Sequence, residues 1–275
     1  MKKPLSLSLV IPAYNESHHI RACLDAIAMQ DVMPLEVIVV DNNSIDDTVA
    51  IAKEYGFVKI VKARRRGIVH ARDAGFNAAT GDIIGRIDAD TLLPPNWVET
   101  VLNFYKVRAN FNYAWTSEGY FHNIKCPTIN SWILTQIAFR LNRVLLGHYA
   151  LWGSTMAVPR VKWLAVRKQI CKRNDIHEDL DIAIHLHELG MKITYDTSVK
   201  VAVEMRRVLT GKDKLWQYLL MWPTTLRVHQ RKTWVLGWIG AATLYSLSPV
   251  LRLNEKVFNM DTTKLKMLFS FMHDL

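Results

Sequence analysis

The stretch LSLVIPAYNE at residues 7–16 decides the fold. Its first seven residues, Leu7–Ala13, are mainly apolar and partly β-branched, which is typical of a buried strand that runs into a polar loop. Apolar runs of the same kind recur at 36–40, 58–61 and 83–87, and segments with helical periodicity separate them. This alternation predicts an α/β fold of the Rossmann-like type, built on a mostly parallel central sheet.

Cap and turn residues mark the helices between these strands. The sequence SIDD at 44–47 has the spacing of a capping box and predicts a helix that ends at Gly56, and Gly81 ends a helix that contains 71–79. In an open α/β sheet, ligands bind beyond the carboxyl ends of the strands. The loops expected to meet at that edge are 13–16, 41–44 and 88–90.

The regular alternation loosens beyond residue 96. Apolar periodicity predicts a helix over 96–107, a strand near 113–118, a helical stretch over 129–145, a strand after the Trp-Gly-Ser sequence at 152–154 and a helix over 178–189. No linker-like composition interrupts this half of the chain. Residues 1–212 are therefore predicted to form one domain.

Residues 213–275 differ in kind and are predicted to form a helical region. The run Trp234–Leu251 is almost uncharged, but it is shorter than the roughly 20 apolar residues that a membrane-spanning helix needs. Basic flanks and neighbouring tryptophans favour a helix that lies in the surface of an anionic membrane. Such a helix would place the protein in the cytoplasm, peripheral at the inner face of the cell membrane. A helix pair in the core and an oligomer contact are the alternatives.

The charge of the chain favours anionic partners. The 35 Lys and Arg residues outnumber the 25 Asp and Glu residues and give a formal net charge of +10. Nucleotide diphosphates, nucleic acid and acidic lipid headgroups all fit that charge. A helix start led by Gly67 carries Arg72, which can face phosphate oxygens there.

The cysteines do not indicate a metal cluster or a disulfide framework. Cys23, Cys126 and Cys171 are odd in number and share no close spacing. The sequence therefore predicts neither a zinc cluster nor disulfide bonds, and a reducing, cytosolic location is expected.

Acidic and aromatic side chains stand where three predicted strands end. Asp88 and Asp90 offer the hard oxygen ligands that Mg²⁺ or Mn²⁺ prefer, although a lone pair of aspartates is also common in turns. A nucleoside can stack on Tyr14 and donate hydrogen bonds to Glu16 and Asp41. Helix capping by these two carboxylates is an alternative that does not exclude nucleotide binding.

Taken in order, these motifs resemble those of family 2 glycosyltransferases, which have the GT-A fold. The resemblance rests on residues 11–16, 41–44, 71–75 with Gly81 and Asp82, 88–90 and, downstream, His177-Glu178-Asp179-Leu180-Asp181. It covers roughly residues 6–205, and the ordered set is far more specific than any one motif. It implies inverting transfer from a nucleotide-diphosphate sugar, with UDP as the expected nucleotide and Mn²⁺ or Mg²⁺ as the cofactor.

The resemblance also implies roles for individual residues. It assigns nucleotide binding to Ala13, Tyr14, Glu16, Asp41, Arg72 and Asp88, metal binding to Asp88 and Asp90, and the general base to Asp179. Further candidates for contact with phosphate or acceptor are Arg206, Arg207, Trp152 and Glu178. A solvated basic loop is the alternative for the two arginines, and a place in the core is the alternative for Trp152.

Two departures and several missing motifs narrow the prediction. Asp73 stands where the family commonly has Asn. The Gln-x-x-Arg-Trp signature of processive members is absent, so transfer of a single sugar to a glycan or lipid-linked acceptor is favoured. A polyprenyl-phosphate sugar synthase is an alternative. The sequence lacks the glycine motifs of dinucleotide enzymes, P-loop proteins and nucleotidyltransferases. A non-catalytic binder of membranes or nucleic acid would leave the acidic set unexplained, so no nucleic-acid partner is expected.

Overall fold

The computed structural model describes residues 4–122, 139–204, 206 and 212–258, with side chains described as far as Ser246 in the last helix. A seven-stranded sheet in the order β3-β2-β1-β4-β6-β5-β7 runs through it. The strands are β1 (Leu7–Ala13), β2 (Glu36–Asp41), β3 (Val58–Lys62), β4 (Ile83–Arg86), β5 (Tyr113–Phe121), β6 (Met156–Pro159) and β7 (Lys192–Val203). Only β6 runs antiparallel to its neighbours, so the sheet is mostly parallel, as predicted.

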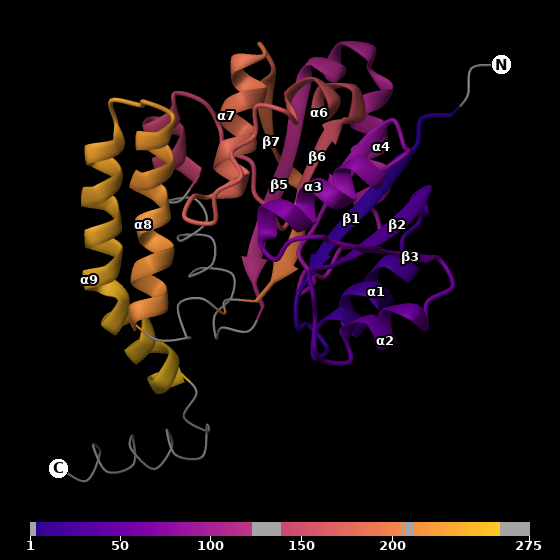
Figure 1. The fold of residues 1–275 in the computed structure, drawn as a ribbon, viewed down its shortest axis with the longest axis horizontal. Coiled ribbons are helices and arrows are strands. Elements are labelled where there is room, and N and C mark those ends of the chain that lie inside the picture. The colour runs from indigo at the N-terminus through magenta and orange to yellow at the C-terminus, as the bar shows by residue number, and fades with distance from the viewer. Residues whose placement is uncertain (1–3, 123–138, 205, 207–211, 259–275) are drawn as a thin grey trace, which may run out of the picture.

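Helices cover both faces of the sheet (Figure 1). One face carries α1 (Ile20–Ala28), α2 (Thr48–Lys53) and α4 (Trp97–Lys106), and the other carries α3 (Ile68–Ala78), α6 (Arg160–Val166) and α7 (Glu178–Glu188). Alternation along β1 explains the two layers, since Leu9 packs into the first core and Val10 into the second. A short 3₁₀ helix at Arg108–Asn112 leads into β5.

The C-terminal region forms a pair of helices beside α7, at one end of the molecule (Figure 1). They are α8 (Lys212–Val228) and α9 (Trp234–Phe258). Trp222 and Leu226 of α8 share a buried cluster with Leu180 and Ile184 of α7. The pair is therefore packed onto the α/β domain by apolar contacts.

The outer side of α9 is apolar and open to solvent. Its exposed side chains, with exposed fractions from 37% to 58%, are Trp234, Val235, Leu236, Trp238 and Ile239. None of the described helices combines the length and the apolarity that crossing a bilayer requires. Attachment of this region to a membrane surface, and the division of the chain at residue 212, remain predictions.

The predicted elements match the observed ones most closely in the first hundred residues. The four predicted strands there coincide with β1 to β4 within one residue. The strand predicted near 113–118 extends to Phe121. Of the helical stretch predicted over 129–145, residues 129–138 lie outside the described part of the chain, as do Cys126 and Arg207. Residues 139–146 are helical.

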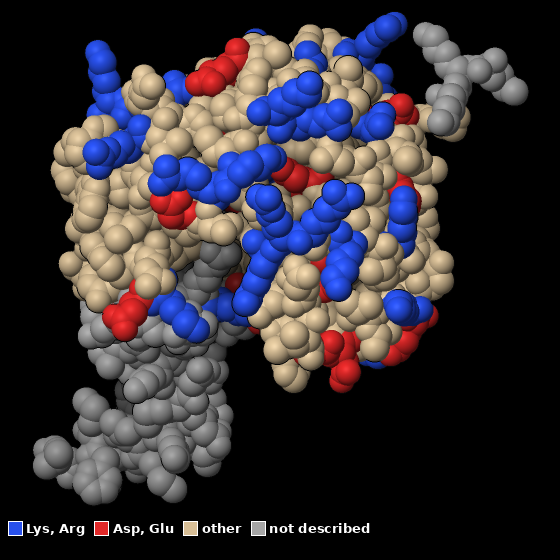
Figure 2. All heavy atoms as spheres, viewed as in Figure 1, with Lys and Arg blue, Asp and Glu red and all other residues tan. Residues whose placement is uncertain are grey.

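Basic side chains gather on the face of the molecule seen in Figure 2. Figure 2 shows Lys and Arg side chains gathered across the middle of one face, with fewer Asp and Glu side chains between them. Such a face attracts anions by a field that ionic strength weakens.

Candidate functional site

The loops that follow β1 and β2 are tied together at the carboxyl edge of the sheet. Asn15 adopts a left-handed conformation with φ 54°, and its side-chain oxygen accepts a hydrogen bond from Ile45 N at 2.9 Å. The Glu16 N–H donates to the Thr48 hydroxyl at 2.8 Å. Asn and Asp are the non-glycine residues that tolerate left-handed backbone best, which explains the Tyr-Asn-Glu turn at this position.

The residues predicted to bind the nucleotide lie around this turn. Ala13 is buried at the end of β1, and the Arg66 guanidinium lies 4.2 Å from the centre of the Tyr14 ring. Asp41 ends β2 and accepts a hydrogen bond from Ser44 N at 2.7 Å through Oδ1. This contact closes a turn within the loop and uses only one carboxylate oxygen, and it is not the helix cap that was the alternative, because α2 begins only at Thr48.

Asp88 and Asp90 follow β4 and differ in their partners. Asp88 Oδ1 lies 2.7 Å from Arg86 Nη2, and its Oδ2 accepts a hydrogen bond from the Ser154 hydroxyl at 2.7 Å. Asp90 Oδ2 lies 2.6 Å from Arg206 Nη2, whereas its Oδ1 is buried without a hydrogen-bond partner in the part of the chain that the structure describes. Burial and the nearby Asp88 raise the pKa of Asp90 to about 6. A buried, unpartnered carboxylate oxygen beside a second carboxylate suits a hard divalent cation.

Arg206 bridges the two acidic loops of the site. Its Nη1 lies 2.7 Å from Glu16 Oε2, while Nη2 contacts Asp90. The guanidinium thereby neutralises a pair of carboxylates that come from separate strand ends. The predicted basic loop thus reaches the acidic edge through at least this one residue.

A buried charge network lies beneath the site. Glu178, at the start of α7, accepts hydrogen bonds from Arg72 Nη1 at 2.6 Å and from Arg86 Nη1 at 2.5 Å. Arg72 is fully buried and also pairs with Asp73, and Arg86 also pairs with Asp88. The guanidinium of Arg72 thus contacts carboxylates of its own chain, and the predicted contact of Arg72 with nucleotide phosphate stays a prediction.

Arg86 is the member of this network that the sequence reasoning missed. It is the last residue of β4, and its side chain is 3% exposed. A charged residue inside an apolar strand needs a buried partner of opposite charge, so its presence at this position was the available signal.

Asp179 lies next to Glu178 in the first turn of α7. Its Oδ1 accepts a hydrogen bond from Leu180 N at 3.0 Å, and its Oδ2 lies 3.4 Å from Gly153 N. Removal from water, followed by the charge of Glu178, raises the pKa of Asp179 above its ordinary value. A carboxylate with a raised pKa is a stronger base and is better able to take a proton.

Trp152 is a half-buried neighbour of the same loop. Its ring lies 6.5 Å from Phe121 and 6.1 Å from Phe139 between ring centres. Gly119 on β5 leaves the space that the indole fills, because an added Cβ would lie 2.2 Å from it. Trp152 therefore packs as part of an aromatic cluster, and its predicted contact with an acceptor stays a prediction.

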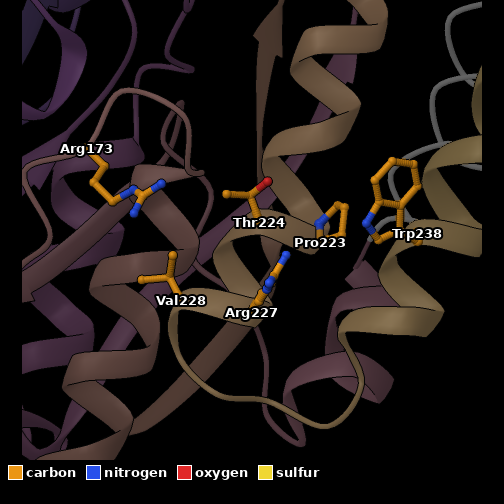
Figure 3. A pocket seen from close by; sticks show the side chains of 6 residues that line it. All are labelled: Arg173, Pro223, Thr224, Arg227, Val228 and Trp238. Carbon is orange, nitrogen blue, oxygen red and sulfur yellow. The ribbon is translucent and has the colours of Figure 1, made fainter.

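A separate pocket lies between the C-terminal helices and the loop before α7 (Figure 3). It has a volume of about 430 Å³ and is lined by Arg173, Pro223, Thr224, Arg227, Val228 and Trp238. None of these residues belongs to the predicted nucleotide, metal or catalytic set. The acidic strand ends, rather than this pocket, carry the chemistry described above.

Sequence comparison agrees with this geometry. The model of the family described as "Glycosyl transferase family 2" matches residues 8–162, more than half of the chain. The chain belongs to glycosyl transferase family 2. Members of this family are transferase enzymes, and both the family and the enzyme class that the motifs predicted are confirmed.

Several curated glycosyltransferases of the family resemble the chain over part of their length. An uncharacterized glycosyltransferase of Escherichia coli, YibD, is 32% identical over 37% of this chain and 31% of its own. The hyaluronan synthase of Pasteurella multocida is 31% identical over 47% of this chain and 16% of its own. The chain therefore spans less than a third of the length of the curated relatives named here.

Solved structures share the fold at low identity. A mannosyltransferase from Pyrobaculum calidifontis, in complex with GDP-Man and Mn²⁺, has a TM-score of 0.61 and 19% identity over 91% of this chain and 73% of its own. A Staphylococcus aureus TarS fragment in complex with UDP-GlcNAc has a TM-score of 0.56 and 15% identity, over 89% and 81% of the two chains. The GT-A fold is thereby confirmed.

Proposed function

We propose that this chain transfers a single sugar, with inversion, from a nucleotide-diphosphate donor to a hydroxyl of a glycan or lipid-linked acceptor. UDP-sugar is the expected donor. The observation that carries the proposal is the acidic edge itself, where one buried oxygen of Asp90 has no hydrogen-bond partner among the described residues and the charges of Asp88 and Glu16 act on the same carboxylate. A site of this kind binds a diphosphate only with added positive charge.

Asp88 and Asp90 are the residues that would hold Mn²⁺ or Mg²⁺. Such an ion, when bound, supplies positive charge against the diphosphate. The Pyrobaculum mannosyltransferase that shares the fold supports this part of the proposal, because it was solved in complex with GDP-Man and Mn²⁺. Arg206 lies close enough to Asp90 to add a second positive charge beside the leaving group.

Asp179 is the proposed general base. Its position at the start of α7 sets it beside Gly153, on the side of the loop that carries Trp152. In a single displacement the acceptor oxygen attacks opposite the departing diphosphate, so the base belongs on the acceptor side and the configuration inverts. Glu178 does not serve as a second base here, because two arginines hold both of its oxygens.

A polyprenyl-phosphate acceptor is the second candidate. The exposed apolar side of α9 favours it, since a lipid-linked acceptor requires the enzyme to reach a membrane surface. Arg227 and Arg231 add positive charge before this helix, which suits anionic headgroups. We accordingly propose a cytoplasmic protein that is peripheral at the inner face of the cell membrane.

Donor turnover tests the proposal. The full chain is incubated with a panel of UDP-, GDP- and dTDP-sugars, with Mn²⁺ or with EDTA, and release of nucleoside diphosphate is measured. One donor class should be turned over with Mn²⁺ only. The Asp90→Ala variant should lose most of the metal dependence of diphosphate binding in calorimetry, because Asp88 alone holds the ion poorly.

An exposed aspartate at the same edge provides the control. Asp47 precedes α2 and is exposed, so Asp47→Asn should bind diphosphate with Mn²⁺ as the wild type does. Equal affinity of the wild-type chain for UDP and GDP in Mn²⁺ and in EDTA would contradict the metal-dependent mechanism. Release of pyrophosphate from a nucleoside triphosphate would instead indicate a nucleotidyltransferase.

A further inference from the structure

Four potential metal ligands meet on the far side of α7 from the acidic edge. Asp181 and His185 lie one turn apart on α7, Cys171 lies in the loop after α6, and His229 follows the last residue of α8. Asp179 and Asp181 differ by two positions, which turns their side chains roughly 200° apart around the helix. The cluster is therefore separate from the residues proposed for sugar transfer.

The ligand atoms of the four residues already lie close together. One ligand atom from each residue lies within 4.8 Å of each of the others. Asp181 Oδ1 is 2.9 Å from His229 Nε2 and 3.5 Å from His185 Nε2. In a tetrahedral zinc site with bonds of about 2.0–2.3 Å, neighbouring ligand atoms are about 3.3–3.8 Å apart. Small side-chain rotations would bring this set to that spacing.

His185 is the least well bonded member of the cluster. Its side chain is 12% exposed, and its two ring nitrogens lie 3.5 Å from Asp181 Oδ1 and 3.6 Å from Glu188 Oε2, so neither makes a well-formed hydrogen bond with the described residues. Buried polar atoms in folded proteins are normally satisfied, and an imidazole with only these long contacts, beside a carboxylate, a thiol and a second imidazole, is suited to bind a cation. Asp181 is fully buried and His229 is 7% exposed, while Cys171 is partly exposed and gives an ion a route from solvent.

We propose that Cys171, Asp181, His185 and His229 bind one Zn²⁺ ion. Thiolate, imidazole and carboxylate are the three ligand types that zinc prefers, and four protein ligands leave no open position for a substrate. The site is thus structural rather than catalytic. It differs from the proposed Mn²⁺ or Mg²⁺ site at Asp88 and Asp90, which offers only oxygen ligands.

The site would join parts of the fold that are far apart in sequence. His229 lies at the end of α8, so the ion would link the C-terminal helix pair to α7 and to the loop after α6. Two hydrogen bonds already lie along the same junction, from His177 N to the Thr225 hydroxyl at 2.9 Å and from Arg231 to Glu188 at 2.9 Å. The helix that would be fixed in this way also carries Asp179, in its first turn.

Cobalt spectroscopy of the full chain tests the proposal. The purified protein is stripped with a chelator and titrated with Co²⁺, which in a tetrahedral site with a thiolate ligand gives visible bands and a sulfur charge-transfer band. We expect saturation at about one ion per chain, bleaching by Zn²⁺, and loss of the charge-transfer band in Cys171→Ser. His185→Gln and His229→Gln should weaken Zn²⁺ binding at least tenfold, as a rough lower bound.

Two controls separate this site from the rest of the protein. The exposed His18 is changed in His18→Gln, which should keep the cobalt spectrum. Asp90→Asn should also keep it, whatever its effect on sugar transfer. In the wild-type chain, without any substitution, Zn²⁺ should protect Cys171 from alkylation and raise the melting temperature. A wild-type chain that binds no more Co²⁺ than Cys171→Ser, or that keeps Cys171 equally reactive with Zn²⁺, would overturn the proposal.

Discussion

The Arg72–Glu178–Arg86 network offers a sharp test of how the site is supported. Glu178 is the only carboxylate among the described residues that contacts both guanidinium groups, and its side chain is 8% exposed. In Glu178→Gln one guanidinium would keep an amide oxygen as its acceptor, and the other would face an NH₂ group. The variant therefore removes one hydrogen bond to a charged group and the charge that holds two buried cations.

The magnitude follows from the partners that remain. Breaking a buried ion pair by removing one partner costs about 3–5 kcal/mol. Arg72 still has Asp73 and Arg86 still has Asp88, and glutamine keeps one of the two hydrogen bonds. We therefore expect Glu178→Gln to lower the free energy of unfolding by about 2–3 kcal/mol, and Glu178→Ala to lower it by about 3–5 kcal/mol.

Urea denaturation followed by tryptophan fluorescence measures the change. The matched control is Glu54→Gln, because the Arg21–Glu54 pair has a similar distance of 2.8 Å but lies at the surface. The control should unfold at the same urea concentration as the wild type. If Glu178→Gln and Glu54→Gln unfold at the same urea concentration, the network does not stabilise the fold. Glu178 would then be a candidate for substrate contact, as the sequence suggested.

Three further predictions concern the base, a buried histidine and the C-terminal helix. Asp179→Asn should lower the rate of transfer to a hydroxyl acceptor by a factor of about 10² to 10⁴, with donor binding little changed. Normal turnover with such an acceptor would refute the assignment, whereas normal turnover with a polyprenyl phosphate would identify an acceptor that is already ionised. Burial lowers the pKa of His148 to about 4 from 6.5, so the unfolded chain binds the proton more tightly than the folded chain. The free energy of unfolding should therefore be full above pH 6.5 and should fall by up to about 3 kcal/mol as the pH drops toward 4. Urea midpoints measured at several pH values should fall less steeply in His148→Gln than in the wild type, and parallel curves would contradict the prediction. The full chain should float with anionic liposomes, and the double variant Trp234→Glu/Trp238→Glu should lose this binding, because both side chains lie on the exposed part of α9. If the wild-type chain floats with neither anionic nor neutral liposomes, the helix serves another contact.

The local part of the fold was predictable from the sequence. Strands such as Leu7–Ala13 and Ile83–Arg86 are apolar runs that end in polar loops, and a parallel sheet places those ends at one edge. The acidic residues at that edge could be named for the same reason. Their combined motif pattern also identified the family.

Contacts between distant parts of the chain could not be predicted in this way. Arg206 meets Glu16 across 190 positions, and Arg72 meets Glu178 across 106. Periodicity places a residue on a face of its own helix, but it does not show which helix covers that face. For this reason, the contact between Arg72 and Glu178 of α7 was not predicted when Arg72 was expected to face phosphate.

The cysteine rule had the same weakness. Spacing between cysteines is informative when several of them share one loop, but Cys171 meets two histidines and an aspartate that come from other segments. The absence of a zinc cluster was predicted from cysteine spacing alone, and the site proposed above has no such spacing, so that prediction still awaits a test. The i, i+4 pair of Asp181 and His185 was the one local signal.

The fit between Gly119 and Trp152 has a consequence for sequence change in this family. Even alanine at 119 would force the indole of Trp152 to shift, and Phe121 and Phe139 pack against that indole. A larger residue at 119 is therefore tolerable only with a smaller one at 152. Across homologues the two positions should covary, so that the surface above β5 changes shape through paired substitutions rather than single ones.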